Sequence, residues 1–84
     1  MSDHYHDPND RQYFRQLRQG APDGFAALGA FDDAALRNEN KVIPAKYNEL
    51  IALGVALTTQ CVYCIEGHVK AAKEAGATQA EIAE

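Results

Sequence analysis

Residues 49–68, ELIALGVALTTQCVYCIEGH, decide how this chain folds. The chain is apolar from residue 50 to residue 57, and good helix formers begin directly after Pro44. Proline suits the first turn of a helix because the backbone N–H that it lacks would have no partner there. A helix that is apolar on all sides is buried. We therefore expect a helix over residues 45–57 that lies in the core or against another subunit.

A second helix is expected to follow the threonines at positions 58 and 59. Thr58 and Thr59 interrupt the apolar pattern, and either hydroxyl can cap a following helix. That helix fits residues 60–75, and Gly76 is suited to end it in the left-handed backbone conformation. Two helices joined by a short turn form an antiparallel hairpin. The fold class predicted from this stretch is all-α.

The N-terminal half also favours helices. Residues 1–8 are polar and acidic and are expected to form a solvated tail. A first helix fits residues 9–19, with Asn9 as its cap and Gly20 at its end. A short helix fits residues 21–33. Three apolar side chains of that segment share one helical face and are expected to pack in the core: Phe25, Leu28 and Phe31.

The C-terminal residues predict one more helix. Thr78 and Glu81 form the pattern of a capping box, and three residues follow Glu81. We therefore expect a helical domain over residues 9–84 that is truncated at its C-terminus or packs on a neighbour there. A chain of 84 residues is too short to cover an extensively apolar helix, so a homo-oligomer is expected.

Composition excludes several classes of function. The net charge is −4 and the eight lysines and arginines are scattered, which argues against binding to nucleic acid. The N-terminus lacks the apolar segment of a secretory signal, and the run 50–57 is too short to span a bilayer. We expect a cytoplasmic protein with no membrane association. In that compartment a Cys-x-x-Cys pair is more often catalytic or metal-binding than a static disulfide.

Cys61, Cys64 and His68 lie on one stripe of the predicted helix 60–75. Residues three apart on a helix are neighbours, with α-carbons about 5 Å apart, a separation that a disulfide tolerates. Residues four apart are also neighbours, so the imidazole of His68 is expected beside Cys64. Three reactive side chains therefore share one helical face.

Glu49 is expected to join this stripe from the other helix. If the turn is centred at residues 58 and 59, Glu49 and His68 lie equally far before and after it. An antiparallel hairpin then brings the two side chains level with each other. Glu49 is also the one carboxylate between Pro44 and Gln60, at the edge of an apolar segment. A carboxylate in that position needs a partner, which the imidazole can supply.

These four groups suit the reduction of a peroxide. A thiolate attacks the O–O bond, a proton goes to the departing alkoxide, and a second thiol resolves the sulfenic acid. The helix dipole favours Cys61 as the attacking thiolate, whereas the neighbouring histidine favours Cys64, so physical chemistry leaves the two nearly even. Glu49 would orient His68 and pass protons. The same groups also support thiol–disulfide exchange.

The pattern E-x11-C-x2-C-x3-H over residues 49–68 resembles the carboxymuconolactone decarboxylase and AhpD-like alkylhydroperoxidase superfamily. The segment KEAGATQAEI, residues 73–82, is similar to the next part of that family. The resemblance implies a homo-oligomeric bundle built around a helical hairpin, a hydroperoxide substrate, and a thiol or lipoamide-type reductant. We expect no cofactor and no metal.

The same resemblance implies roles for the four side chains. Cys64 would attack the peroxide, Cys61 would resolve it, and Glu49 and His68 would relay protons. The Cys-x-x-Cys pair favours the redox branch, because the decarboxylase branch typically lacks it. Tyr63 is a departure, since well-studied members carry a histidine between the cysteines and a phenol is a poor proton shuttle at neutral pH.

Three other interpretations stay open. The cysteines could be small buried apolar residues. The two cysteines, His68 and Glu49 could together bind a metal, although zinc ligands more often come from loops or separate elements. The chain could also be a lyase that uses Glu49 and His68 without redox cycling.

Overall fold

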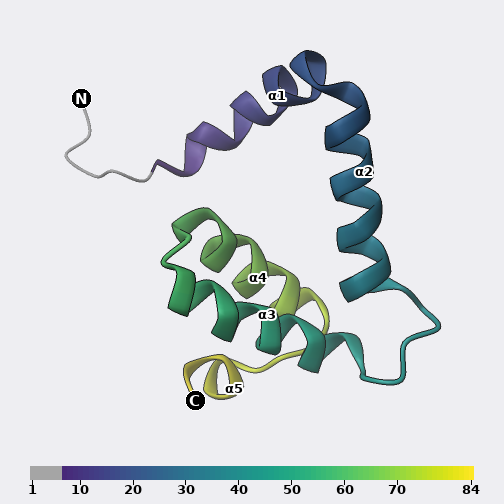
Figure 1. Cartoon of the computed structure of the whole chain (residues 1–84). Coiled ribbons are helices and arrows are strands. Elements are labelled where there is room, and N and C mark those ends of the chain that lie inside the picture. Colours follow the sequence, from purple (N-terminus) through teal and green to yellow (C-terminus); the bar gives the residue numbers. More distant parts are fainter. Residues whose placement is uncertain (1–6) are drawn as a thin grey trace. The chain divides into compact units, whose positions relative to one another are not determined.

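A computed structural model describes residues 7–84 of the chain (Figure 1). The predicted tail therefore lies outside the described residues, apart from its last two positions. Between residues 7 and 84 the structure consists of helices and connecting loops without a strand, so the all-α prediction is confirmed. The chain divides into two compact units, one that ends at Ala35 and one formed by Leu36–Glu84. Each unit is described separately below.

The first unit begins with a 3₁₀-helix, η1 (Pro8–Tyr13), which continues into α1 (Phe14–Gly20). The predicted cap was wrong. Asp7, and not Asn9, caps this helix, because its carboxylate accepts from the backbone N–H of Asn9 at 2.9 Å. The proline after Asp7 suits the first helical position, where no N–H is needed. The predicted helix over 9–19 is thus confirmed with an earlier start and with Gly20 inside it.

Helix α2 (Pro22–Asp32) confirms the predicted helix over 21–33, but its expected core is not buried. Phe25 is half-buried and makes an edge contact with Phe14 of α1, at 6.5 Å between ring centroids. Leu28 and Phe31 are 65% and 70% exposed. Helical spacing places apolar side chains on one face, but burial also needs a partner for that face. In this unit α1 supplies such a partner for Phe25.

The second unit is the predicted helical hairpin. The π-helical turn η2 (Asp33–Arg37) leads into it, and α3 (Ala45–Thr59) packs along α4 (Val62–Glu74). Figure 1 shows these two helices side by side. Small residues and one leucine form the buried contact, which lets the two backbones approach closely. The buried apolar side chains of the two helices are Leu53, Ala56 and Ala72, and Ala77 is buried directly after α4.

The turn of the hairpin lies later than predicted. Thr58 and Thr59 belong to α3, and their hydroxyls donate to the carbonyls of Val55 and Ala56 at 2.7 and 3.2 Å. A threonine near a helix end can bond backward in this way instead of capping the next helix. The chain reverses at Gln60, which has a φ of 60°. The second helix accordingly starts at Val62 and not at Gln60.

The C-terminal signals are confirmed. Gly76 has a φ of 99°, and the N–H groups of Gly76 and Ala77 donate to Lys73 and Ala72 at 3.0 and 2.9 Å, which closes α4. Helix α5 (Gln79–Ala83) then starts with the complete capping box of Thr78 and Glu81. Since the left-handed conformation suits glycine, the end of α4 could be predicted from sequence.

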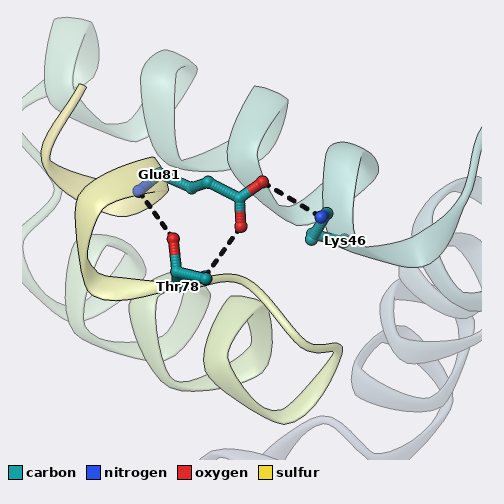
Figure 2. Close-up of polar contacts among 3 residues, drawn as sticks. All are labelled: Lys46, Thr78 and Glu81. Carbon is teal, nitrogen blue, oxygen red and sulfur yellow. Dashed lines mark hydrogen bonds and ion pairs between the residues drawn. The ribbon is translucent and has the colours of Figure 1, made fainter.

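An ion pair fastens α5 to the start of α3 (Figure 2). Oε2 of Glu81 lies 3.0 Å from Nζ of Lys46, and its Oε1 accepts from the backbone N–H of Thr78 at 2.8 Å. The hydrogen bond from Thr78, followed by that from Lys46, lowers the pKa of Glu81. The hydrogen bond to Glu81 raises the pKa of Lys46. The capping glutamate therefore also links two helices.

Helix α3 is buried on one face only. Leu53 and Ala56 face α4, whereas Ile51, Val55 and Leu57 are each more than half exposed. The expectation of burial on all sides is therefore wrong for the single chain. The predicted oligomer, which would cover the outer face, stays a prediction. Within residues 7–84 no helix is both long and apolar enough to cross a membrane.

Candidate functional site

Cys61 and Cys64 form a disulfide at the start of α4, with 5.2 Å between their α-carbons. The predicted separation of about 5 Å is confirmed. Cys61 is not inside the helix, however. It is the N-cap of α4, and its Sγ accepts from the backbone N–H of Cys64 at 3.3 Å. The reversal at Gln60 explains this, since it delays the helix by two residues.

The two sulfur-bearing side chains differ in accessibility. Cys64 is exposed and Cys61 is half-buried. Both lie at the positive end of the α4 dipole, where a thiolate is favoured. A small molecule in solution therefore has better access to Cys64 than to Cys61, to which Cys64 is bonded. Tyr63, which lies between the two cysteines in the sequence, is half-buried.

Glu49 and His68 meet across the hairpin, as predicted. Oε2 of Glu49 lies 2.7 Å from Nδ1 of His68. Glu49 is only 3% exposed, although it is a glutamate. A buried carboxylate needs compensating partners, and the imidazole is one of them. The pairing shows that the hairpin register was predicted well enough to match two residues 19 positions apart.

The contact places Nδ1 of His68, and not Nε2, against the carboxyl group. A carboxylate can only accept hydrogen bonds, so an ionised Glu49 pairs with a donating Nδ1 and leaves Nε2 to face other groups. Side chains on an α-helix lean toward its N-terminus, which carries the imidazole over the turn that bears Cys64. His68 is thus suited to take a proton from, or return one to, a group beside Cys64.

Arg37 is a member of this site that sequence reasoning missed. Its Nη2 lies 3.6 Å from Oε1 of Glu49, the carboxylate oxygen that His68 does not use. Arg37 comes from η2, in a polar connection without a regular pattern, so no spacing rule places it near Glu49. A buried carboxylate does signal that a cation lies near it. It does not say which arginine or lysine supplies one.

The metal-site interpretation finds no support in the described residues. Between residues 7 and 84 no group of three or more histidine, cysteine, aspartate or glutamate side chains is arranged to hold a metal ion. The cysteines are bonded to each other, and Glu49 is turned to His68 and Arg37. The buried-hydrophobe interpretation also fails for Cys64, because that side chain is exposed.

Residues 22–84 match the Carboxymuconolactone decarboxylase family. This match covers more than half of the chain and includes the whole hairpin with its cysteines, Glu49 and His68. The chain belongs to the carboxymuconolactone decarboxylase family. The Cys61–Cys64 pair is consistent with the AhpD-like branch of that family.

Two curated bacterial proteins are similar to this chain. "Uncharacterized protein 4 in cox locus" of Paracoccus denitrificans is 47% identical over 64 residues, which cover 74% of this chain and 51% of the relative. An "Uncharacterized protein" of Haemophilus influenzae is 41% identical over 67 residues, which cover 80% of this chain and 58% of the relative. The chain thus spans little more than half the length of these relatives, and neither name states an activity.

Proposed function

We propose that this protein is a thiol-dependent peroxidase or disulfide reductase that cycles between a dithiol and a disulfide at Cys61 and Cys64. The observation that carries the proposal is the disulfide at the N-terminus of α4, one helical turn from a histidine that is paired with a buried glutamate. Membership of the carboxymuconolactone decarboxylase family supports it, because the redox branch that the sequence resembles carries such a cysteine pair.

The first step consumes the hydroperoxide. The Cys64 thiol gives its proton to Nε2 of His68, and the thiolate attacks the terminal oxygen of ROOH. The O–O bond breaks, sulfur is oxidised to the sulfenic acid Cys64–SOH, and the departing alkoxide takes the proton from His68 and leaves as ROH. The positive end of α4 and the exposure of Cys64 favour this sulfur as the nucleophile.

The second step closes the disulfide. The Cys61 thiol attacks the sulfenic sulfur, the S–O bond breaks, and water leaves with the proton of that thiol and the hydroxyl of the sulfenic acid. The hydroperoxide has then accepted two electrons. An external dithiol, of the lipoamide type or a small thiol pair, returns them by thiol–disulfide exchange and becomes a disulfide itself. Thiol–disulfide exchange without peroxide uses the same two sulfurs.

A thiol count tests this proposal. The reduced protein receives one equivalent of cumene hydroperoxide, and thiols are counted before and after. We expect a loss of two thiols per chain and one equivalent of the corresponding alcohol. A full retention of thiols would contradict the peroxidase function. If thiols are lost with oxidised lipoamide but not with the hydroperoxide, the protein is a disulfide reductase and not a peroxidase.

The assignment of the attacking sulfur has its own test. Cys61→Ser keeps Cys64 without its resolving partner, so the sulfenic acid should persist and react with a dimedone-type trap. Cys64→Ser is the matched control and should give no labelled protein. Label on Cys64→Ser alone would reverse the roles of the two cysteines.

A lyase is the second candidate, and the Glu49–His68 pair favours it because that pair is complete without either sulfur. General acid and base catalysis on an unsaturated lactone needs a proton donor and acceptor but no redox centre. The two candidates differ in one variant. Cys64→Ser abolishes a peroxidase, whereas a lyase keeps its activity in that variant and loses it in His68→Gln.

A further inference from the structure

Glu49 is shared between a cation and an imidazole. Its Oε1 faces Nη2 of Arg37 at 3.6 Å, and its Oε2 faces Nδ1 of His68 at 2.7 Å. Only 4% of the Glu49 side chain is exposed, so both oxygens depend on protein partners rather than on water. The proposed reaction uses His68 directly and Glu49 to orient it. It leaves the role of Arg37 unassigned.

Arg37 is the last residue of the π-helical turn η2, and a folded connection follows it. The connection turns at Asn38, whose carbonyl accepts from Lys41 at 3.2 Å and whose side chain accepts from the backbone N–H of Asn40 at 2.8 Å. A short asparagine-based turn of this kind fixes the backbone direction over a few residues. The turn directs the chain from Arg37 back toward α3.

A second hydrogen bond fastens the same connection to α3. Asn48 is only 6% exposed, and its side-chain amide donates to the carbonyl of Ile43 at 2.9 Å. An unsatisfied buried amide is costly, so this bond resists opening. Since Asn48 is adjacent to Glu49 in α3, the anchor of the connection and the carboxylate that Arg37 faces move together.

The cation decides where the proton of the pair resides. A guanidinium carries donors only and keeps its charge at every physiological pH. A Glu49 that is ionised beside it accepts at both oxygens, and Nδ1 of His68 is then the donor of the pair. If Glu49 held a proton instead, it could donate to Nδ1, and the ring proton would move to Nε2. The imidazole would then have no lone pair for a thiol proton.

We propose that Arg37 is a positioning residue whose guanidinium keeps Glu49 a hydrogen-bond acceptor and thereby keeps Nε2 of His68 open as the base for the Cys64 thiol. The role of Nε2 as the base for the Cys64 thiol rests on the proposed function. The arrangement of the protons is a property of the resting protein and can be measured without any substrate.

The first experiment reads the histidine tautomer. Imidazole ¹⁵N shifts are recorded on the reduced protein near neutral pH, with the His68 signals identified by their loss in His68→Asn. In the native chain we expect a protonated Nδ1 and an unprotonated Nε2. Arg37→Met should populate the opposite tautomer. Arg18→Met, which changes an exposed arginine of α1, is the matched control and should keep the native pattern.

The second experiment reads the rate. Under single-turnover conditions with cumene hydroperoxide, Arg37→Met should slow thiol loss by about ten- to a hundredfold, the usual effect of removing the partner that orients a reacting group. Arg37→Lys keeps a cation and should recover part of this rate. Added guanidinium at millimolar concentration should likewise speed up Arg37→Ala but not the native chain.

The outcomes separate this inference from the proposed function. A native tautomer in a folded Arg37→Met, or an Arg37→Lys as slow as Arg37→Met, overturns the role of Arg37. Should the Met variant fail to fold, the lysine variant and the guanidinium experiment decide the same point. If the native chain loses no thiol with peroxide, the proposed function fails, and the tautomer experiment still decides what Arg37 does.

Discussion

In α3, Leu53 and Ala56 are buried against α4, whereas Leu28 and Phe31 in α2 have the same kind of helical spacing and stay exposed. Both helices are rich in apolar residues. The difference is that α3 has a long antiparallel partner within its own unit, whereas the shorter α1 contacts α2 at Phe25 and leaves Leu28 and Phe31 exposed. An apolar helical face is therefore buried only where a partner packs against it, and in this chain the hairpin provides such a partner.

Truncating one leucine in each region tests this contrast, and it has the largest expected effect on the free energy of unfolding. Leu53→Ala should lower the free energy of unfolding by roughly 2–5 kcal/mol, because it leaves a cavity between α3 and α4. Leu28→Ala should change it by no more than about 0.5 kcal/mol, because the side chain is 65% exposed. Urea denaturation followed by circular dichroism measures both. Equal losses would show that the face of α2 is covered in solution.

Substitution of one glycine in each region tests the same comparison, with an intermediate expected effect on stability. Gly76→Ala should destabilise the hairpin unit by about 1 kcal/mol, because alanine resists the φ of 99° that closes α4. Gly29→Ala should stabilise α2 by about 0.5–1 kcal/mol, because a Cβ there meets open space in a helix interior. The thermal unfolding midpoints of the two variants should shift in opposite directions. A loss of stability in Gly29→Ala would reveal a hidden contact on α2.

The smallest expected effect is the pH dependence of the α5 contact. The pKa of Glu81 lies below its usual 4.5, so its contribution is complete above pH 4.5 and is lost as the pH falls through the folded value. The pKa of Lys46 is raised above 10.5, so its contribution is complete below that pH and is lost as the pH rises through the folded value.

Hydrogen exchange of the α5 amides over a pH series measures this contact, after correction for the intrinsic exchange rate. Acid should release α5 before the hairpin opens, and Glu81→Gln should remove the acid-dependent part of that release. An unchanged acid response in Glu81→Gln would place the titrating group elsewhere.

Much of the hairpin could be predicted from the sequence because its signals are local and unambiguous. Gly76, Thr78 and Glu81 each have one favourable role in the backbone, and they adopt it. The pairing of Glu49 with His68 followed from counting residues on either side of a turn. The turn lies about two residues later than that count assumed, so Glu49 and His68 are not equally far from it, yet their side chains still meet at 2.7 Å.

The features that could not be predicted depend on choices between near-equal local states. Thr58 and Thr59 can cap a following helix or bond back to the preceding one, and their spacing does not distinguish these outcomes. Gln60 adopts a left-handed conformation in which glycine or asparagine would be expected. Arg37 ends a short π-helical turn that is followed by an irregular connection, and no periodicity predicts that it lies near Glu49.

The disulfide joins residues only three positions apart. A cross-link that closes so short a loop restricts the unfolded chain very little, because loop entropy grows with the length enclosed. The backbone around it is already held by the packing of α3 on α4 and by the reversal at Gln60. Opening and closing this bond can therefore be a local event that leaves the packing of α3 on α4 unchanged.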